Sequence, residues 1–305
     1  MSSVANPVVY PPAESARQQQ QPPWLTLAWF LGLLVLCYAP VLTRLVQQWN
    51  NDEDMGHGFF VPVIAAYIAW QKRGKLLGRQ LKPNYLGLVL VVFAAVQMYI
   101  GTLGAELFLA RTAIVEAIVG IVLVLGGTYA LRVMAFPLVV LCFMVPLPAV
   151  IYNRITFPLQ IFASQVAAFV VELLGTPVLR DGNVLELPSQ RLNVVEACSG
   201  IRSLLSLTFL SLVYGYFFDN KSWMRIALFV ATVPIAIIAN AGRVTLTGVM
   251  SEINADLAHG TAHTASGWVI FMIALAIMVV VHQIINRVYK FLSKRSAVKL
   301  ENANA

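Results

Sequence analysis

Three residues of this 305-residue chain carry side chains that together could perform acyl transfer: Cys198, Arg243 and His263. Cys198 lies just before an apolar run, and a helix that begins there would favour the thiolate through the positive end of its dipole. Arg243 lies within another apolar run, where a guanidinium is costly and therefore marks a candidate functional residue. His263 precedes the last apolar run and can exchange protons near neutral pH. The set supplies a nucleophile, a cation for an oxyanion and an acid/base, provided that the fold brings them to one face.

The composition indicates that these residues belong to a membrane protein. Hydrophobic residues make up 59% of the chain and charged residues 11%, against about 25% charged residues in an ordinary soluble domain. This balance excludes a soluble globular enzyme, a disordered tail, a collagen-like fibre and a disulfide scaffold. The formal charge of +7 is typical of basic cytoplasmic loops, so we expect no nucleic-acid partner.

We predict an all-α polytopic membrane protein with about eight transmembrane helices, an amphipathic surface helix and a small outer-face hairpin. The hairpin follows from the turn signal Asp181-Gly182-Asn183 between short apolar runs. The predicted spans are residues 24–42, 58–70, 85–103, 108–129, 133–151, 201–218, 226–248 and 266–286.

Segment 155–174 decides the orientation. If it does not cross the membrane, all the lysines fall in the cytoplasm, as the positive-inside rule requires. Its polar residues recur at multiples of four, which favours a helix lying on the outer surface, with a ninth span as the alternative. These residues are Thr156, Gln160, Ser164 and Glu172.

The expected organisation is a single membrane domain with two tails. Residues 1–23 are predicted to form a disordered cytoplasmic tail, residues 24–286 the transmembrane domain with an outer-face segment at 152–200, and residues 287–305 a basic cytoplasmic tail. The protein would then be a multi-pass protein of the cytoplasmic (inner) membrane with both termini cytoplasmic and its active site at the periplasmic or outer face.

Two further patterns leave alternatives open. Glu252, Asp256, His259 and His263 could share a helical face and bind a metal, but no H-E-x-x-H motif is present and Gly260 weakens a continuous helix. We therefore expect no metal and no cofactor. The loop around His57 could be a solvated turn or could line the substrate entrance.

Around these residues the chain resembles the exosortase/archaeosortase family, which are polytopic membrane proteins proposed to be cysteine transpeptidases. The resemblance covers about residues 25–290. The matching motifs are Glu196-Ala-Cys-Ser-Gly-Ile-Arg202, Asn240-Ala-Gly-Arg243, His263 ahead of Ser266-Gly-Trp268, and Gly56-His57-Gly58 before an apolar run.

The resemblance implies that Cys198 is the nucleophile, Arg243 the oxyanion stabiliser and His263 the acid/base. It also implies that the substrates are exported proteins with a C-terminal sorting region, usually of the PEP-CTERM type. We assign His57, Arg202 and Asn240 to substrate binding, and expect membrane lipids and an unknown acceptor nucleophile as the other partners. The alternatives are a non-enzymatic membrane component of exopolysaccharide export and a metal-dependent intramembrane hydrolase.

Overall fold

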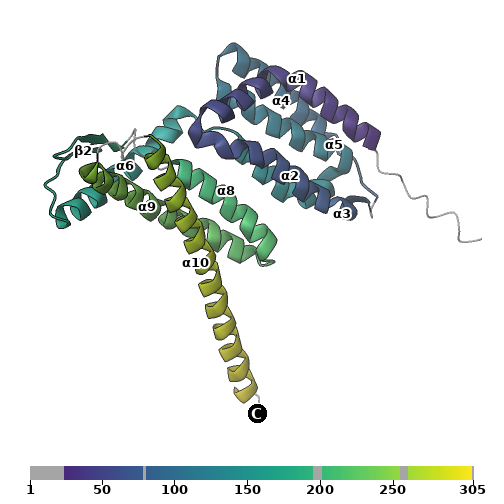
Figure 1. Cartoon of the computed structure of the whole chain (residues 1–305). Coiled ribbons are helices and arrows are strands. Elements are labelled where there is room, and N and C mark those ends of the chain that lie inside the picture. The colour runs from purple at the N-terminus through teal and green to yellow at the C-terminus, as the bar shows by residue number, and fades with distance from the viewer. Residues whose placement is uncertain (1–23, 78–79, 195–200, 255–259, 304–305) are drawn as a thin grey trace, which may run out of the picture.

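The computed structural model describes residues 24–77, 80–194, 201–254 and 260–303, with a few side chains near the segment ends left out. Almost all of these residues are helical (Figure 1). The α-helices are α1 (Trp24–Asn51), α2 (Phe60–Gln71), α3 (Arg73–Leu77), α4 (Leu86–Leu103), α5 (Leu107–Leu141), α6 (Ala149–Leu173), α8 (Ile201–Phe218), α9 (Ser222–Ile253) and α10 (Gly260–Ala303). Two 3-10 helices, η2 (Glu53–Phe59) and η3 (Cys142–Met144), and three strands, β1 (Leu179–Asp181), β2 (Val184–Glu186) and β3 (Arg191–Asn193), complete the description.

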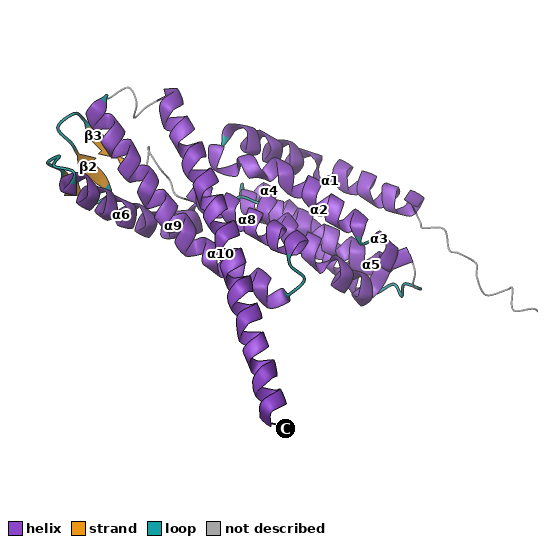
Figure 2. Ribbon diagram, turned by 60° about the horizontal axis from the view of Figure 1, so that its bottom comes forward, coloured by secondary structure: helices purple, strands orange, loops and turns teal. Residues whose placement is uncertain are grey.

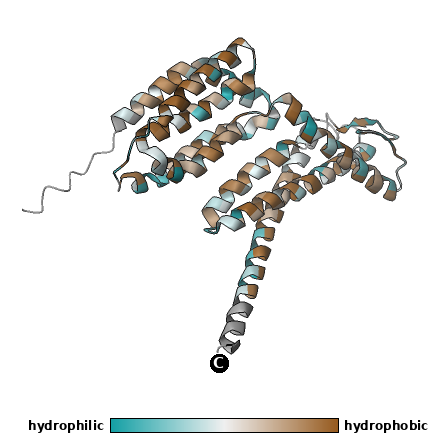
Figure 3. Ribbon diagram, turned by 180° about the vertical axis from the view of Figure 1, so that it is seen from behind, coloured by the Kyte–Doolittle hydropathy of each residue, from teal (hydrophilic) through white to brown (hydrophobic). Residues whose placement is uncertain are grey.

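The prediction of an all-α polytopic membrane protein is confirmed. Among the described residues, 7 helical segments are long and apolar enough to cross a membrane. They are Ala28–Asn51, Leu86–Leu103, Leu107–Met144, Ala149–Leu173, Ile201–Phe218, Ser222–Ile253 and Thr264–Ser293. Hydrophobic residues cover much of the helical surface (Figure 3), as expected for helices that face lipid. Helix α2, predicted as a span, has only 12 residues.

Helix α5 has two arms that meet at Gly127, which lies inside the predicted span 108–129 and not between the predicted spans. The predicted span 133–151 begins in the second arm but continues past the end of α5 at Leu141 into the start of α6. Gly127 has φ 66° and ψ −165°, a backbone conformation that ends one helical arm and begins the next. The arms run in opposite directions. Leu123 accepts a hydrogen bond from the Asn84 amide (3.3 Å) near this turn, whereas Met144, past the second arm, accepts one from Trp49 Nε1 (3.0 Å) at the other end of the bundle.

Helix α6 carries the predicted polar stripe, but the stripe faces the protein. Thr156, Gln160 and Ser164 are buried, and only Glu172 at the end of the stripe is exposed. Large apolar side chains such as Phe169 are also exposed. Ser164 Oγ donates to the Gly182 carbonyl oxygen (2.9 Å). The stripe therefore does not mark a water-facing side, and whether α6 crosses the membrane or lies on it stays a prediction.

The small hairpin is present and gains a third strand. Strands β1, β2 and β3 form an antiparallel sheet in sequence order, which lies beside α6 and α9 (Figure 2). Asp181 pairs with Val184 across the turn, where Gly182 adopts φ 59°. The sheet packs on α6 and α9 through a buried apolar cluster that includes Leu185, Leu192 and Val244.

Two helices are much longer than a bilayer requires. The 32 residues of α9 and the 44 residues of α10 correspond to about 48 Å and 66 Å, against a hydrocarbon core of about 30 Å. Residues 287–303, predicted as part of a basic tail, continue α10 as helix, and this part projects away from the bundle (Figure 1).

Candidate active site

Arg243 belongs to α9 and His263 to α10, and α8 begins three residues after Cys198. The three helices pack on one another through a buried cluster of Leu207, Ile235, Ala236, Ala274 and Met278. Helices α8 and α9 are antiparallel neighbours because a short turn joins them, so the first residues of α8 lie beside the later part of α9. The predicted convergence of the three residues depends on the packing of these three helices and stays a prediction.

Arg243 lies at the contact between α9 and α10. A methyl group added at Gly267 of α10 would lie 3.0 Å from both Cζ and Nη2 of Arg243 and 3.2 Å from its Nε. The guanidinium thus packs directly against the α10 backbone. His263 belongs to the first turn of α10 and precedes Gly267 by four residues, so both positions share one helix face about 6 Å apart along the axis.

Cys198 lies outside the described residues, as does the side chain of His263. Helix α8 begins at Ile201, three residues after the cysteine. Leu204, one turn into α8, lines a common hollow with Ala236 and Asn240 of α9. Because α8 and α9 are antiparallel, the chain preceding Leu204 continues toward the level of Arg243. The meeting of all three side chains stays a prediction.

Helix α9 presents two buried polar side chains on the same face as Arg243. Asn240 is 4% exposed and Thr247 is 1% exposed, and within the described part of the chain neither side chain has a hydrogen-bond partner. Spacings of three and four residues place both on the stripe that contains Arg243. An unsatisfied buried polar group costs about 1–3 kcal/mol, so this stripe is suited to binding polar groups of a ligand. Asn240 was predicted from its motif, whereas Thr247 was not, although helical spacing from Asn240 places it on the same face.

Arg202, predicted to bind substrate, is held by an acidic residue of η2. Its Nε donates to Asp54 Oδ1 at 3.1 Å, with 38% of the Arg202 side chain and 15% of the Asp54 side chain exposed. The Tyr152 hydroxyl donates to Asp54 Oδ2 at 2.6 Å. Asp54 therefore joins η2 to α6 and α8, and its carboxylate already balances the Arg202 charge.

His57, in η2, packs against a part of α8 that lies further along the chain than Cys198. Its Nδ1 is 3.4 Å from Ser206 Oγ, and its ring centroid lies 6.0 Å from that of Phe209. Burial lowers the pKa of His57 below its ordinary value, against smaller opposing effects of Phe143 and Asp54. At neutral pH the imidazole is therefore uncharged, and its contact with substrate stays a prediction.

A family model described as transmembrane exosortase matches residues 49–280, which is most of the chain. The chain belongs to the transmembrane exosortase family. Membership supports a sorting or transpeptidase role in the membrane, with a protein substrate that carries a sorting signal. Curated proteins and solved structures give no match to this exosortase.

The alternative metal constellation of this exosortase begins with Glu252. Its Oε1 accepts hydrogen bonds from the Ser189 hydroxyl (2.6 Å) and the Ser189 amide (3.2 Å), so this carboxylate ties the segment between β2 and β3 to the end of α9. Asp256 and His259 lie outside the described residues. The metal alternative therefore stays a hypothesis.

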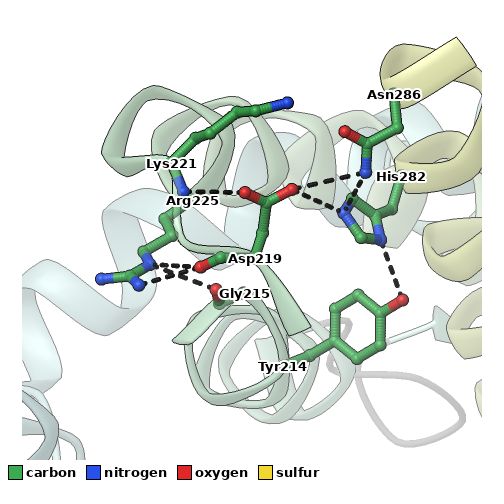
Figure 4. A network of polar contacts seen from close by, with 7 residues as sticks. All are labelled: Tyr214, Gly215, Asp219, Lys221, Arg225, His282 and Asn286. Carbon is green, nitrogen blue, oxygen red and sulfur yellow. Dashed lines mark hydrogen bonds and ion pairs between the residues drawn. The ribbon is translucent and has the colours of Figure 1, made fainter. Parts of the chain in front are cut away.

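A second polar cluster of the exosortase, which the sequence analysis missed, lies at the opposite end of the same helices (Figure 4). Asp219 and His282 are both buried, with His282 Nε2 3.2 Å from Asp219 Oδ2 and His282 Nδ1 2.9 Å from the Tyr214 hydroxyl. Burial raises the pKa of Asp219, but hydrogen bonds from the Lys221 amide, His282 and Asn286 outweigh it, so the net shift is downward. His282 thus ties α10 to the turn between α8 and α9.

Proposed function

We propose that this protein is a membrane-embedded cysteine protease or transpeptidase that cleaves the C-terminal sorting region of exported proteins, of the PEP-CTERM type. The observation that carries the proposal is the packing of the Arg243 guanidinium against Gly267, one helical turn from His263 and beside the end of α9 that faces the start of α8. A fixed cation at the place where a nucleophile and an imidazole converge is the arrangement that acyl transfer requires.

The proposed reaction begins with attack of the Cys198 thiolate on the scissile carbonyl. Arg243 stabilises the negative charge on the carbonyl oxygen in the tetrahedral intermediate. The C–N bond then breaks, His263 gives a proton to the leaving amine, and a thioester joins the substrate to Cys198. An amine, a hydroxyl of a glycan or lipid, or water then attacks the thioester and gives its proton to His263, and the thiolate leaves, which restores the enzyme.

The substrate is oriented by its own transmembrane helix, which packs beside α9 in the bilayer and sets the depth of the scissile bond. The polar groups of Asn240 and Thr247 bind the extended peptide near that bond. Their burial without protein partners within the described chain supports this assignment. Arg202 contributes to substrate binding from the position in which its hydrogen bond to Asp54 holds it.

The proposed orientation places the basic loops in the cytoplasm and the reactive end at the periplasmic or outer face of the inner membrane. Lys72 and Lys221 lie at the end of the bundle that contains the Asp219–His282 pair. Arg243 lies toward the other end. Both termini are then cytoplasmic.

The decisive experiment replaces Cys198 by Ala in cells that express a substrate with a PEP-CTERM-type sorting region. We expect the uncleaved precursor to accumulate, while the matched variants Cys37→Ala and Cys142→Ala process the substrate normally. Mass spectrometry of the mature C-terminus separates the two outcomes of the thioester: a free carboxylate shows hydrolysis and an added group shows transfer. Normal processing by Cys198→Ala would refute the proposal, and sensitivity to chelators together with loss of processing in His259→Ala would favour the metal-dependent hydrolase.

A further inference from the structure

Two cations from distant parts of the chain meet around one aromatic ring at the basic end of the bundle. Lys72 Nζ, at the end of α2, lies 5.2 Å from the centroid of the Tyr216 ring and donates to the Val133 carbonyl oxygen at 2.9 Å. Arg225 Cζ, in α9, also lies 5.2 Å from the Tyr216 centroid. The Phe136 ring stacks on Tyr216 with centroids 4.2 Å apart. We call Lys72, Arg225, Tyr216 and Phe136 the paired-cation site.

Among the residues that the structure describes, no carboxylate pairs with Lys72 or Arg225 at this site. The sequence has no acidic residue at positions 55–105 or 117–171 and a single one, Asp219, at positions 197–251. The Asp219 carboxylate receives its hydrogen bonds from the Lys221 amide, His282 and Asn286. Only its backbone carbonyl contacts Arg225, which donates to it from Nε (3.1 Å) and Nη2 (2.8 Å).

The two cations repel each other. The pKa of Lys72 is lowered, first by burial and then by the charges of Lys75 and Arg225. Both Lys72 and Arg225 are only half-exposed, so water screens the repulsion incompletely. Figure 4 shows one terminal nitrogen of Arg225 pointing away from the carbonyls of Gly215 and Asp219. An anion bound between Lys72 and this nitrogen would offset the repulsion.

An apolar wall adjoins the site on its membrane side. Tyr67 and Trp70, one turn apart from each other on α2, are 55% and 53% exposed, and Phe217, next to Tyr216 on α8, is 41% exposed. The Tyr67 and Phe217 rings approach to 6.1 Å between centroids. A ligand that is anionic at one end and apolar along the rest matches this combination, whereas a free inorganic anion uses only the cations.

We propose that Lys72 and Arg225 bind the phosphate of an anionic phospholipid in the leaflet at the basic end of the bundle, with an acyl chain against Tyr67 and Phe217. Basic sites between transmembrane helices near the membrane surface are a recurrent way to bind anionic lipid headgroups. The lipid would link α2, which belongs to the N-terminal bundle, to α8 and α9, which carry the reactive end.

The test uses the purified full-length protein in a neutral detergent, where no charged leaflet attracts basic residues non-specifically. Native mass spectrometry measures the binding of phosphatidylglycerol, phosphatidylcholine and inorganic phosphate. We expect one phosphatidylglycerol to bind and phosphatidylcholine to bind at least ten-fold more weakly. Lys72→Gln should weaken phosphatidylglycerol binding about five-fold, the factor that corresponds to about 1 kcal/mol per basic residue.

The matched control is Arg73→Gln, which removes the same charge from the neighbouring position. Arg73 is exposed, and its Cζ stacks on Trp70 at 4.2 Å from the ring centroid instead of facing Tyr216. This variant should bind phosphatidylglycerol within two-fold of the unmodified protein. Equal losses in Arg73→Gln and Lys72→Gln, equal binding of the two lipids, or full displacement of the lipid by inorganic phosphate would each overturn the proposal.

Discussion

Replacing Gly267 by Ala tests whether the position of Arg243 against α10 matters for the reaction. The new Cβ would lie 3.0 Å from Cζ and Nη2 of Arg243, closer than such atoms normally approach. The guanidinium must then move by a few tenths of an ångström. Because a misplacement of about 1 Å of a catalytic group reduces the rate about 100-fold, a shift of about 0.3 Å predicts a loss of about four-fold.

The effect on stability should have the opposite sign. Alanine is favoured over glycine inside a helix by about 1 kcal/mol, so Gly267→Ala should unfold at a slightly higher temperature even as it reacts more slowly. Gly242→Ala is the matched control, because Gly242 adjoins Arg243 in α9 and a Cβ there meets nothing within 4 Å. It should gain the same stability and keep the full rate.

The assay follows cleavage of a PEP-CTERM-type substrate co-reconstituted with the enzyme in vesicles, with the rate expressed per folded molecule. Thermal unfolding in detergent supplies the stability of each variant. Equal rates for Gly267→Ala and Gly242→Ala would contradict this prediction, because the contact between Arg243 and α10 would then have no bearing on catalysis. A loss of rate accompanied by a loss of stability would instead indicate a folding defect.

Three further predictions concern the scaffold. Gly127→Ala forces a positive φ on alanine and drives its Cβ into the Lys82 carbonyl oxygen, so it should destabilise the protein by about 3 kcal/mol; a normal yield of monodisperse protein in size-exclusion chromatography would contradict this. A double-mutant cycle of Asp54→Asn and Arg202→Gln, measured by chemical unfolding, should give a coupling of about 1 kcal/mol, limited by the 38% exposure of the Arg202 side chain; additive effects would show that the ion pair contributes nothing. Burial lowers the pKa of His57 from its ordinary 6.5, so the unfolded state binds more protons and stability should fall as the pH drops below about 6.5. His57→Gln should flatten that part of the profile, and an unchanged pH dependence would exclude His57 as its source.

Hydropathy predicted the helices well where the membrane itself determines their ends. The predicted span 201–218 coincides with α8, and the predicted span 85–103 differs from α4 by one residue. The same signal could not show that α10 continues to Ala303, because polar residues in water form helix without a hydrophobic pattern. It also gave no indication of how the two arms of α5 are joined, since that depends on the backbone of one glycine.

Periodicity predicted a polar face on α6 but not the structure that covers it. The spacing of Thr156, Gln160 and Ser164 is helical, and water was the simplest partner for such a face. The structure supplies protein instead, because Gly182 and Asn183 of the hairpin accept from and donate to this stripe. Pairings between segments distant in the sequence leave no trace in a single helix pattern.

Short motifs led to the candidate site, and its catalytic assignment stays a prediction. The structure adds that Arg243 lies against Gly267 of α10, one helical turn after His263. The buried pair Asp219 and His282, separated by 63 residues, was missed because neither residue stands in a recognisable motif. Thr247 was missed because its burial without a partner is a property of packing, which composition does not reveal.

Among the described helices of 25 residues or more, α10 alone contains no proline; α1, α5, α6 and α9 each contain one. Its projecting part stands clear of the bundle (Figure 1). A soluble helical protein fused in phase to this rod would be held at a fixed angle to the membrane domain. It would serve as a fiducial for electron cryomicroscopy of a target that is otherwise too small and too buried in its micelle to align.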